Sequence, residues 1–241
     1  MSNNIVFAAD GFEYEVREKL DKPDRPITAE DISSITELDC TNFDFYHEDA
    51  GVLEQFVNLE TLSIDICCDS LSFLSSLLKL RELFIIYRNG NGKLDFSAFA
   101  CLDNLESLWV SGGDISNIDF VNTESLIGLK KLTSLELHEF GTVDLSFLEQ
   151  MPWLEWFSCR YADKIINVDS IGKLRNLKEL WLDGDELDDL DFLDHFPDSL
   201  KLNISGNKVY KDTDINRLKR FTNADISDLE INGRLYFPFW L

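Results

Sequence analysis

The chain has 241 residues, and its hydrophobic content of 44% is typical of a folded protein and excludes extensive disorder. Its formal net charge of −23 argues against binding to nucleic acid or to an anionic membrane, because both require a basic surface. The same charge favours a protein partner with a basic patch.

The amino-terminal residues, MSNNIVFAADGFEYE, lack the cationic start and the uninterrupted apolar run of a secretory signal. No apolar stretch of the sequence approaches the length that a membrane-spanning helix requires. These features predict a cytoplasmic protein, which we expect to be monomeric when free. The odd number of cysteines, five, favours reduced thiols over a disulfide framework.

From Ile35 onward one hydrophobic pattern recurs, at start-to-start distances of 21 to 27 residues. Nine segments follow the form LxxLxL, and 26 of their 27 required apolar positions are apolar, with Ser199 as the exception. The segments begin at Ile35, Leu59, Leu80, Leu105, Leu132, Leu154, Leu177, Ser199 and Ile226. Each predicts a short strand whose leucines share one face, and only stacking of neighbouring units can bury that face.

This is the leucine-rich repeat pattern, and the chain resembles short-repeat, internalin-like bacterial proteins over nearly its whole length. The second halves of several units carry the resemblance, as in VDLSFLEQM at Val143–Met151 and LDDLDFLDHF at Leu187–Phe196. It implies an α/β solenoid, a leucine-rich repeat horseshoe with a parallel concave sheet and short helical or irregular convex segments. It also implies one continuous domain: a helical N-terminal cap (1–34), the repeats (35–225), and the last repeat strand with a C-terminal cap (226–241).

One departure from this pattern concerns the asparagine that usually follows the third leucine by three residues. It is present only as Asn207, and the other units carry Phe43, Cys67, Arg88, Gly113, Phe140, Ala162, Asp185 and Arg234. A continuous inward ladder of asparagine amides is therefore missing, so the backbone of most turns must be paired in another way.

The carboxyl end of such an array needs a cover. Tyr236, Phe237, Phe239 and Trp240 would otherwise form an exposed apolar cluster, so we expect them to close the last repeat. A sticky terminal peptide is the alternative interpretation.

Side chains between the leucines point out of the concave sheet, because successive strand residues alternate between its two faces. The candidate partner-binding residues on this surface are Phe84, Tyr87, Trp109, Glu136, His138, Glu139, Trp156, Arg160, Tyr161, Trp181 and Asp183. We expect Phe84, Tyr87 and Trp109 to gather in the first half of the face and the other aromatic residues in the second. Aromatic residues and arginine carry most of the energy of protein interfaces, so this pattern predicts a docking face.

Lateral packing within the sheet is the alternative explanation for these side chains. Exposed aromatic rings can simply pack on neighbouring strands, and Arg160 can simply pair with Asp183. Six aromatic residues on one face favour a binding surface, because scattered surface apolar groups are normal whereas clustered ones are not.

The sequence carries no recognisable metal-binding or catalytic arrangement. The acidic run DGDELDDLD, from Asp183 to Asp191, invites a calcium interpretation, but Leu187 occupies the third EF-hand ligand position and the glycine is misplaced. The three histidines lack metal-ligand spacing: His47, His138 and His195. We therefore expect no metal, no cofactor and no catalytic residues, and a protein that is not an enzyme.

These observations predict a non-catalytic scaffold that captures a protein partner on an aromatic and acidic concave face. A strongly acidic chain of this kind could be the immunity protein of a basic toxin, because an anionic surface speeds capture. The alternatives are an internalin-like surface adhesin, which needs export, an acidic mimic of nucleic acid, and a hydrolase hosted by the long units near Gly90 or Asn122.

Overall fold

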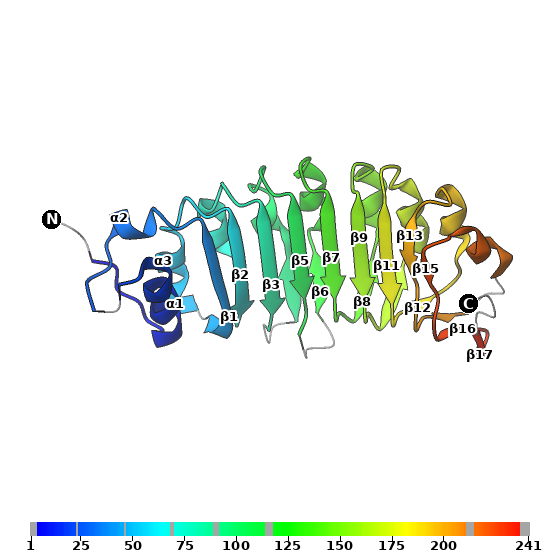
Figure 1. Ribbon diagram of the computed structural model, residues 1–241, viewed down its shortest axis with the longest axis horizontal. Coiled ribbons are helices and arrows are strands. Elements are labelled where there is room, and N and C mark those ends of the chain that lie inside the picture. The colour runs from blue at the N-terminus through cyan, green and yellow to red at the C-terminus, as the bar shows by residue number, and fades with distance from the viewer. Residues whose placement is uncertain are drawn as a thin grey trace.

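The computed structural model describes residues 4–22, 24–45, 47–67, 70–88, 92–113, 118–210 and 215–236. A nine-stranded sheet runs the length of the molecule in the order β1-β2-β3-β5-β7-β9-β11-β13-β15 (Figure 1), and its strands are parallel. The predicted leucine-rich repeat solenoid is therefore confirmed. The strands are Glu37–Phe45 (β1), Thr61–Ile66 (β2), Glu82–Tyr87 (β3), Ser107–Ser111 (β5), Ser134–His138 (β7), Trp156–Arg160 (β9), Glu179–Asp183 (β11), Lys201–Asn203 (β13) and Ala224–Asp225 (β15).

The segments that return the chain from one strand to the next lie behind the sheet (Figure 1). Most contain a 3-10 helix: His47–Asp49 (η1), Ser72–Ser76 (η2), Phe96–Phe99 (η3), Thr123–Gly128 (η4), Ser146–Gln150 (η5), Val168–Lys173 (η6), Asp191–His195 (η7) and Ile215–Arg220 (η8). Short strands accompany them: Lys93–Asp95 (β4), Asp119–Val121 (β6), Thr142–Asp144 (β8), Lys164–Ile166 (β10), Glu186–Leu187 (β12), Lys208–Val209 (β14), Leu229–Ile231 (β16) and Arg234–Tyr236 (β17). Within the described part of the chain, no helix combines the length and apolar character needed to span a membrane.

Neighbouring repeats keep a common register across the sheet, so their inward side chains lie side by side. Leu135 of β7 pairs with Leu108 of β5 on one side and with Phe157 of β9 on the other. All three are fully buried. Burial of such a side chain contributes about 1.5–3 kcal/mol, and it is available only when the next repeat covers it.

The aspartate that precedes several convex turns has a local structural role. The Oδ1 atom of Asp144 accepts hydrogen bonds from the backbone N–H of Ser146 (2.9 Å) and from Nδ2 of Asn167 in the next repeat (2.8 Å). Asp95 accepts the same two kinds of bond. One carboxylate therefore both starts a 3-10 turn and ties it to its neighbour.

The amino end of the array is covered by helices α1 (Asp10–Leu20), α2 (Ala29–Ile32) and α3 (Ala50–Leu53) (Figure 1). Phe12 and Val16 of α1 are fully buried. The Phe12 ring lies 5.4 Å from that of Phe45 and 5.8 Å from that of Phe56. The apolar face of α1 thus covers the first repeats, and the predicted helical N-terminal cap is confirmed.

The last predicted strand is in the wrong register. The main sheet ends at β15, where Ala224 pairs with Leu202 of β13, so the ninth repeat is FTNADI and begins at Phe221. The predicted segment ISDLEI instead supplies β16, which pairs with β14 in a small separate sheet. Both segments have apolar residues at the required spacing, and the small side chain of Ala224 made the correct one less conspicuous. The proposed closing residues Phe237, Phe239 and Trp240, and the side chain of Tyr236, lie outside the described residues.

Asn207 and Asp185 form the part of the asparagine ladder that this chain retains. Asn207 Oδ1 accepts from the N–H of Asp185 (3.0 Å), and its buried Nδ2 donates to the carbonyl oxygens of Leu182 and Ile204. Asp185 Oδ1 likewise accepts from the N–H of Ala162 (2.7 Å). The Oδ2 atom of Asp185 takes the position in the ladder that Nδ2 has in Asn207. It is buried and has no hydrogen-bond partner among the described residues.

Burial of this carboxyl group raises the pKa of Asp185 from 3.8 to about 8. The folded protein therefore holds this proton more tightly than the unfolded chain does. The contribution of this proton to the free energy of unfolding is complete below the pKa that Asp185 has in the unfolded chain. It is lost as the pH rises from about 4 through about 8, and the free energy of unfolding falls by no more than about 1.4 kcal/mol per pH unit.

We predict that Asp185→Asn removes this pH dependence, because the amide keeps the acceptor for Ala162 and supplies a donor that does not titrate. Urea unfolding at a series of pH values should show the variant gaining stability over the wild type as the pH rises. Asn207→Asp, which places a carboxyl group at the equivalent position, should show the opposite trend. Parallel pH profiles for the wild type and Asp185→Asn would contradict the assignment.

Candidate functional site

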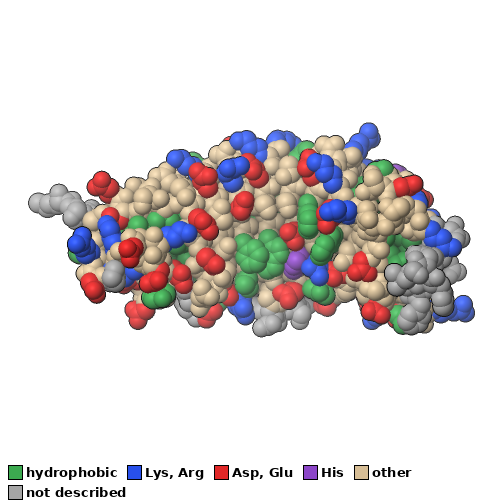
Figure 2. Space-filling model, in the orientation of Figure 1, with side chains coloured by type: hydrophobic (Ala, Val, Ile, Leu, Met, Phe, Trp, Pro, Cys, Tyr) green, Lys and Arg blue, Asp and Glu red, His purple; other side chains and the backbone are tan. Residues whose placement is uncertain are grey.

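The candidate site is the outer face of the nine-stranded sheet, called here the concave face. Figure 2 shows apolar side chains gathered near the middle of this face, with acidic side chains around them. The common register places Phe84, Trp109, Glu136, Ser158 and Trp181 in one row across five strands. The sequence prediction therefore placed these outward positions correctly.

Phe84 and Trp109 form the first aromatic cluster. Their rings are parallel, with centroids 3.7 Å apart, and the Trp109 ring meets His138 edge-on at 5.2 Å. All three side chains are half-buried. Stacking fixes the rings while leaving part of their surface open to solvent.

Trp156 and Trp181 form the second cluster, with ring centroids 5.7 Å apart. Trp181 Nε1 donates to Glu179 at 2.9 Å. In contrast, Trp156 Nε1 is enclosed and has no partner in the described part of the chain. A buried donor left unpaired costs about 1–3 kcal/mol, and the Nε1 atom of Trp153, away from this face, is likewise enclosed and without a partner among the described residues.

Arg160 and Asp183 form an ion pair beside the second cluster. The Arg160 Nε donates to one carboxylate oxygen of Asp183 and its Nη2 to the other, at 2.8 Å for the second contact. The hydrogen bond to Asp183 raises the pKa of the Arg160 guanidinium group. The same guanidinium group lies 5.2 Å from the Trp181 ring and 5.1 Å from the Tyr161 ring. Arg160 thus has the partner that lateral packing predicts, and it also joins the aromatic cluster.

Tyr87 was expected on the concave face, and this prediction is wrong. Strand β3 continues through Tyr87, so alternation turns its side chain inward, where it is 1% exposed and donates from its hydroxyl to Lys93 O (2.7 Å). In later repeats the chain leaves the strand at this position through a positive φ, at Glu139 (61°) and Tyr161 (58°). Their side chains therefore stay outside: Glu139 accepts from the Ser111 hydroxyl, and Tyr161 is 53% exposed.

Glu136, His138 and Ser158 lie between the two aromatic clusters. His138 Nε2 is 3.2 Å from Ser158 Oγ and 3.5 Å from a Glu136 carboxylate oxygen. These residue types suggest a catalytic triad, but a triad needs the acid and the serine on opposite imidazole nitrogens. Here both contact Nε2, and Ser158 is fully buried. The arrangement is suited to holding the side chains in place rather than to activating a nucleophile.

The acidic run Asp183–Asp191 is divided among separate structural roles. Asp183 pairs with Arg160, Asp185 belongs to the ladder, and Asp191 pairs with Arg217 at 2.6 Å. Among the described residues, the group with metal-ligand proximity is instead formed by Asp44, Asp65 and Cys67, whose candidate ligand atoms lie within 4.8 Å of one another.

The group formed by Asp44, Asp65 and Cys67 does not have the character of a metal site. Arg88 Nε contacts both carboxylate oxygens of Asp65, at 3.0 and 2.9 Å, and so occupies the ligand atoms. Burial raises the pKa of the Cys67 thiol to about 11, which keeps it protonated at neutral pH.

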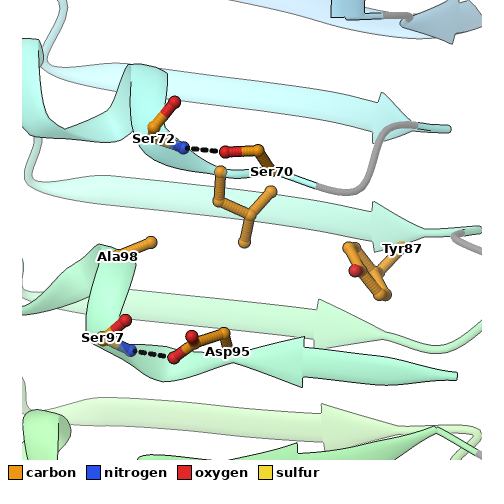
Figure 3. Close-up of a pocket in the computed structure, with 7 residues that line it drawn as sticks. Ser70, Ser72, Tyr87, Asp95, Ser97 and Ala98 are labelled. Carbon is orange, nitrogen blue, oxygen red and sulfur yellow. Dashed lines mark hydrogen bonds between the residues drawn. The ribbon is translucent and has the colours of Figure 1, made fainter. Parts of the chain in front are cut away.

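A pocket of about 250 Å³ lies on the other side of the sheet and is lined by three serines, a leucine, an alanine, an aspartate and the inward ring of Tyr87 (Figure 3). The Ser70 hydroxyl accepts from Ser72 N (3.2 Å), and Asp95 accepts from Ser97 N (2.9 Å). These bonds begin the turns η2 and η3. The polar groups that Figure 3 joins by dashed lines thus serve the turn architecture of the convex side.

The fold defines a leucine-rich repeat solenoid protein, and comparison with solved structures agrees. An internalin C2 from Listeria monocytogenes is 20% identical, with a TM-score of 0.72 over 92% of this chain and 94% of that one. An internalin from the same organism is 21% identical, with a TM-score of 0.53 over 94% and 83%.

The ectodomain of an Arabidopsis thaliana membrane receptor kinase, solved in complex with Casparian strip integrity factor 2, is 14% identical. Its TM-score is 0.55, over 85% of this chain and 25% of that one. No protein-family model matches the sequence, and no curated protein matches it. The structural likenesses therefore establish the fold of the chain.

We predict that the Arg160–Asp183 pair contributes coupled stability on this face. Arg160→Met should cost about 1–2 kcal/mol, because the 10% exposed Asp183 side chain then lacks its partner. The double variant with Asp183→Asn should recover part of that loss, since no buried charge remains. Urea unfolding of the four proteins in the double-mutant cycle measures the coupling, and purely additive losses would show that the pair is not coupled.

Proposed function

We propose that this chain is a non-catalytic scaffold that captures a protein partner on its concave face. The observation that carries the proposal is the pair of half-buried aromatic clusters, Phe84 with Trp109 and Trp156 with Trp181. Clustered, ordered indole rings with open surface are the side chains that anchor protein interfaces.

The charge of the chain supports a basic partner. With a net charge of −23, the long-range field attracts cationic proteins and repels acidic ones. The receptor kinase ectodomain with a similar fold is described in complex with a second molecule, which supports a binding role for this architecture. Neutralisation of a basic toxin in the cytoplasm is the narrower form of the proposal, because rapid capture is what complementary charge provides.

We predict that Trp109→Ala, Trp156→Ala and Trp181→Ala together raise the dissociation constant for the partner by at least about 100-fold, because a single interface anchor contributes about 2 kcal/mol or more and the contributions of neighbouring anchors are not additive. The partner is obtained by affinity purification from the native host, and calorimetry then measures its affinity. Trp153→Ala is the matched control, since this tryptophan packs under Lys130 (3.8 Å) away from the face. Unchanged affinity of a folded triple variant would refute the concave-face assignment.

The salt dependence of the complex separates aromatic anchoring from mimicry of nucleic acid. If the rings anchor the partner, added salt should slow association while leaving the dissociation rate nearly constant, because screening acts on the approach of the two proteins. Stopped-flow association and surface plasmon resonance dissociation measure the two rates. A complex held only by charge would dissociate steeply faster between low and moderate salt.

A further inference from the structure

The turn between β11 and β12 lies beside a cavity of about 260 Å³, which is formed by the segments that follow β9, β11 and β13. Two glycines with positive φ, Gly184 (77°) and Gly206 (66°), line the cavity and carry no side chain that would fill it. Tyr161, Asp185 and Lys208 line the same cavity. A buried acid, an exposed aromatic ring and a cation therefore share one hollow.

The two carboxyl oxygens of Asp185 have different surroundings. Oδ1 accepts from the Ala162 N–H at 2.7 Å, whereas Oδ2 is enclosed and has no hydrogen-bond partner among the described residues. In the protonated form Oδ2 carries a hydrogen and can act as a donor, as Nδ2 of Asn207 does. In the ionised form the same atom would bear buried charge without a donor, so the ionised carboxylate gains free energy by leaving this position.

Lys208 is the cation nearest to this turn along the ladder. Its backbone N–H donates to the carbonyl oxygen of Asp185 at 3.0 Å, which places the two residues on adjacent turns. Its side chain is 57% exposed, and its contact with Glu186 is long, at 4.0 Å. An ionised Asp185 is therefore attracted toward a cation that lines the same cavity and is only loosely held.

Both signs of charge surround Asp185. The titratable and charged groups around it are Asp183 and Glu186 on its own segment, Cys159, Arg160, Tyr161 and Asp163 on the β9 side, and Lys208 on the β13 side. Arg160 is held through both carboxylate oxygens of Asp183. Burial is the largest influence and raises the pKa of Asp185 to about 8, so the ionised form gains population around neutral and mildly alkaline pH.

Tyr161 connects this turn to the concave face. Its ring packs so closely on Gly184 that a Cβ atom there would lie 2.7 Å from Tyr161 Cδ1. Its hydroxyl accepts from Arg160 Nη2 at 3.1 Å, and the Arg160 guanidinium group lies 5.2 Å from the Trp181 ring. Because Tyr161 directly precedes Ala162, the hydrogen bond from Ala162 to Asp185 helps to fix the place of this ring.

We propose that this turn is a two-state element that the ionisation of Asp185 switches. In the closed state, the protonated carboxyl group occupies the ladder and holds the Ala162 N–H. In the open state, the carboxylate lies in the cavity against the Lys208 ammonium group, the Ala162 N–H is released, and Tyr161 loses its fixed place beside Arg160. Rising pH thus loosens one border of the second aromatic cluster while the leucine core stays folded. The device belongs to the chain itself and operates without a partner.

The test is amide hydrogen exchange of the full chain, followed by NMR between about pH 5 and about pH 8 and corrected for the intrinsic rate of exchange. The closed state holds the proton and the open state releases it, so opening becomes more favourable as the pH rises. The protection of the Ala162 amide should therefore fall by about tenfold per pH unit while the closed state predominates. The Asp185 amide is the internal control, because it donates to Asn207, which does not titrate, and its protection should change far less.

Two variants separate the switch from a general loss of structure. Asp185→Asn should keep the Ala162 amide protected at every pH. Lys208→Gln should reduce the opening by about two- to fivefold, the effect of one partly exposed ion pair. Lys178→Gln is the matched control, since it removes an exposed lysine at the other end of β11 and should leave the opening unchanged.

The proposal is overturned if the protection of the Ala162 amide does not depend on pH, or if Asp185→Asn shows the same fall as the wild type. An equal fall at the Asp185 amide would show general unfolding and would overturn it as well. If Lys208→Gln and Lys178→Gln behave alike, the cavity does not receive the carboxylate at Lys208, and the open state proposed here is wrong.

Discussion

Register between neighbouring strands is the constraint on which both the core and the outer face depend. Where Leu135 pairs with Phe157, alternation also sets Glu136 beside Ser158 and Ser134 beside Trp156. A slip of one residue would exchange the two sets and place a carboxylate in the core. The buried leucines therefore determine where every outward side chain stands, although they do not touch a partner themselves.

The sequence was sufficient to predict the parts of the site that follow from alternation alone. Phe84, Trp109 and Trp181 lie inside their strands and Trp156 begins β9, so all four are in regular strand, where the direction of a side chain depends only on parity. Tyr87 could not be placed in this way, because its direction depends on where β3 ends. That end is set by backbone torsions in an irregular turn, and no residue type in the repeat pattern reports them.

Asp185 shows a different limit of the sequence. Its departure from the asparagine pattern was visible, but a turn aspartate is ordinarily exposed and ionised, as Asp144 is at its own turn. Only the structure shows that Asp185 takes the acceptor role of the ladder and leaves Oδ2 buried. The energetic consequence depends on a single missing donor, which the residue name alone does not reveal.

Lateral packing and partner binding are compatible explanations of the aromatic face. The rings of Phe84 and Trp109 already stack on one another, and Arg160 already lies over Trp181, so these side chains lose little conformational freedom when a partner docks. An isolated tryptophan would have to be ordered by the partner at a cost of about 0.5–1.5 kcal/mol. Cross-strand contacts on the concave face therefore act as preorganisation of the aromatic side chains.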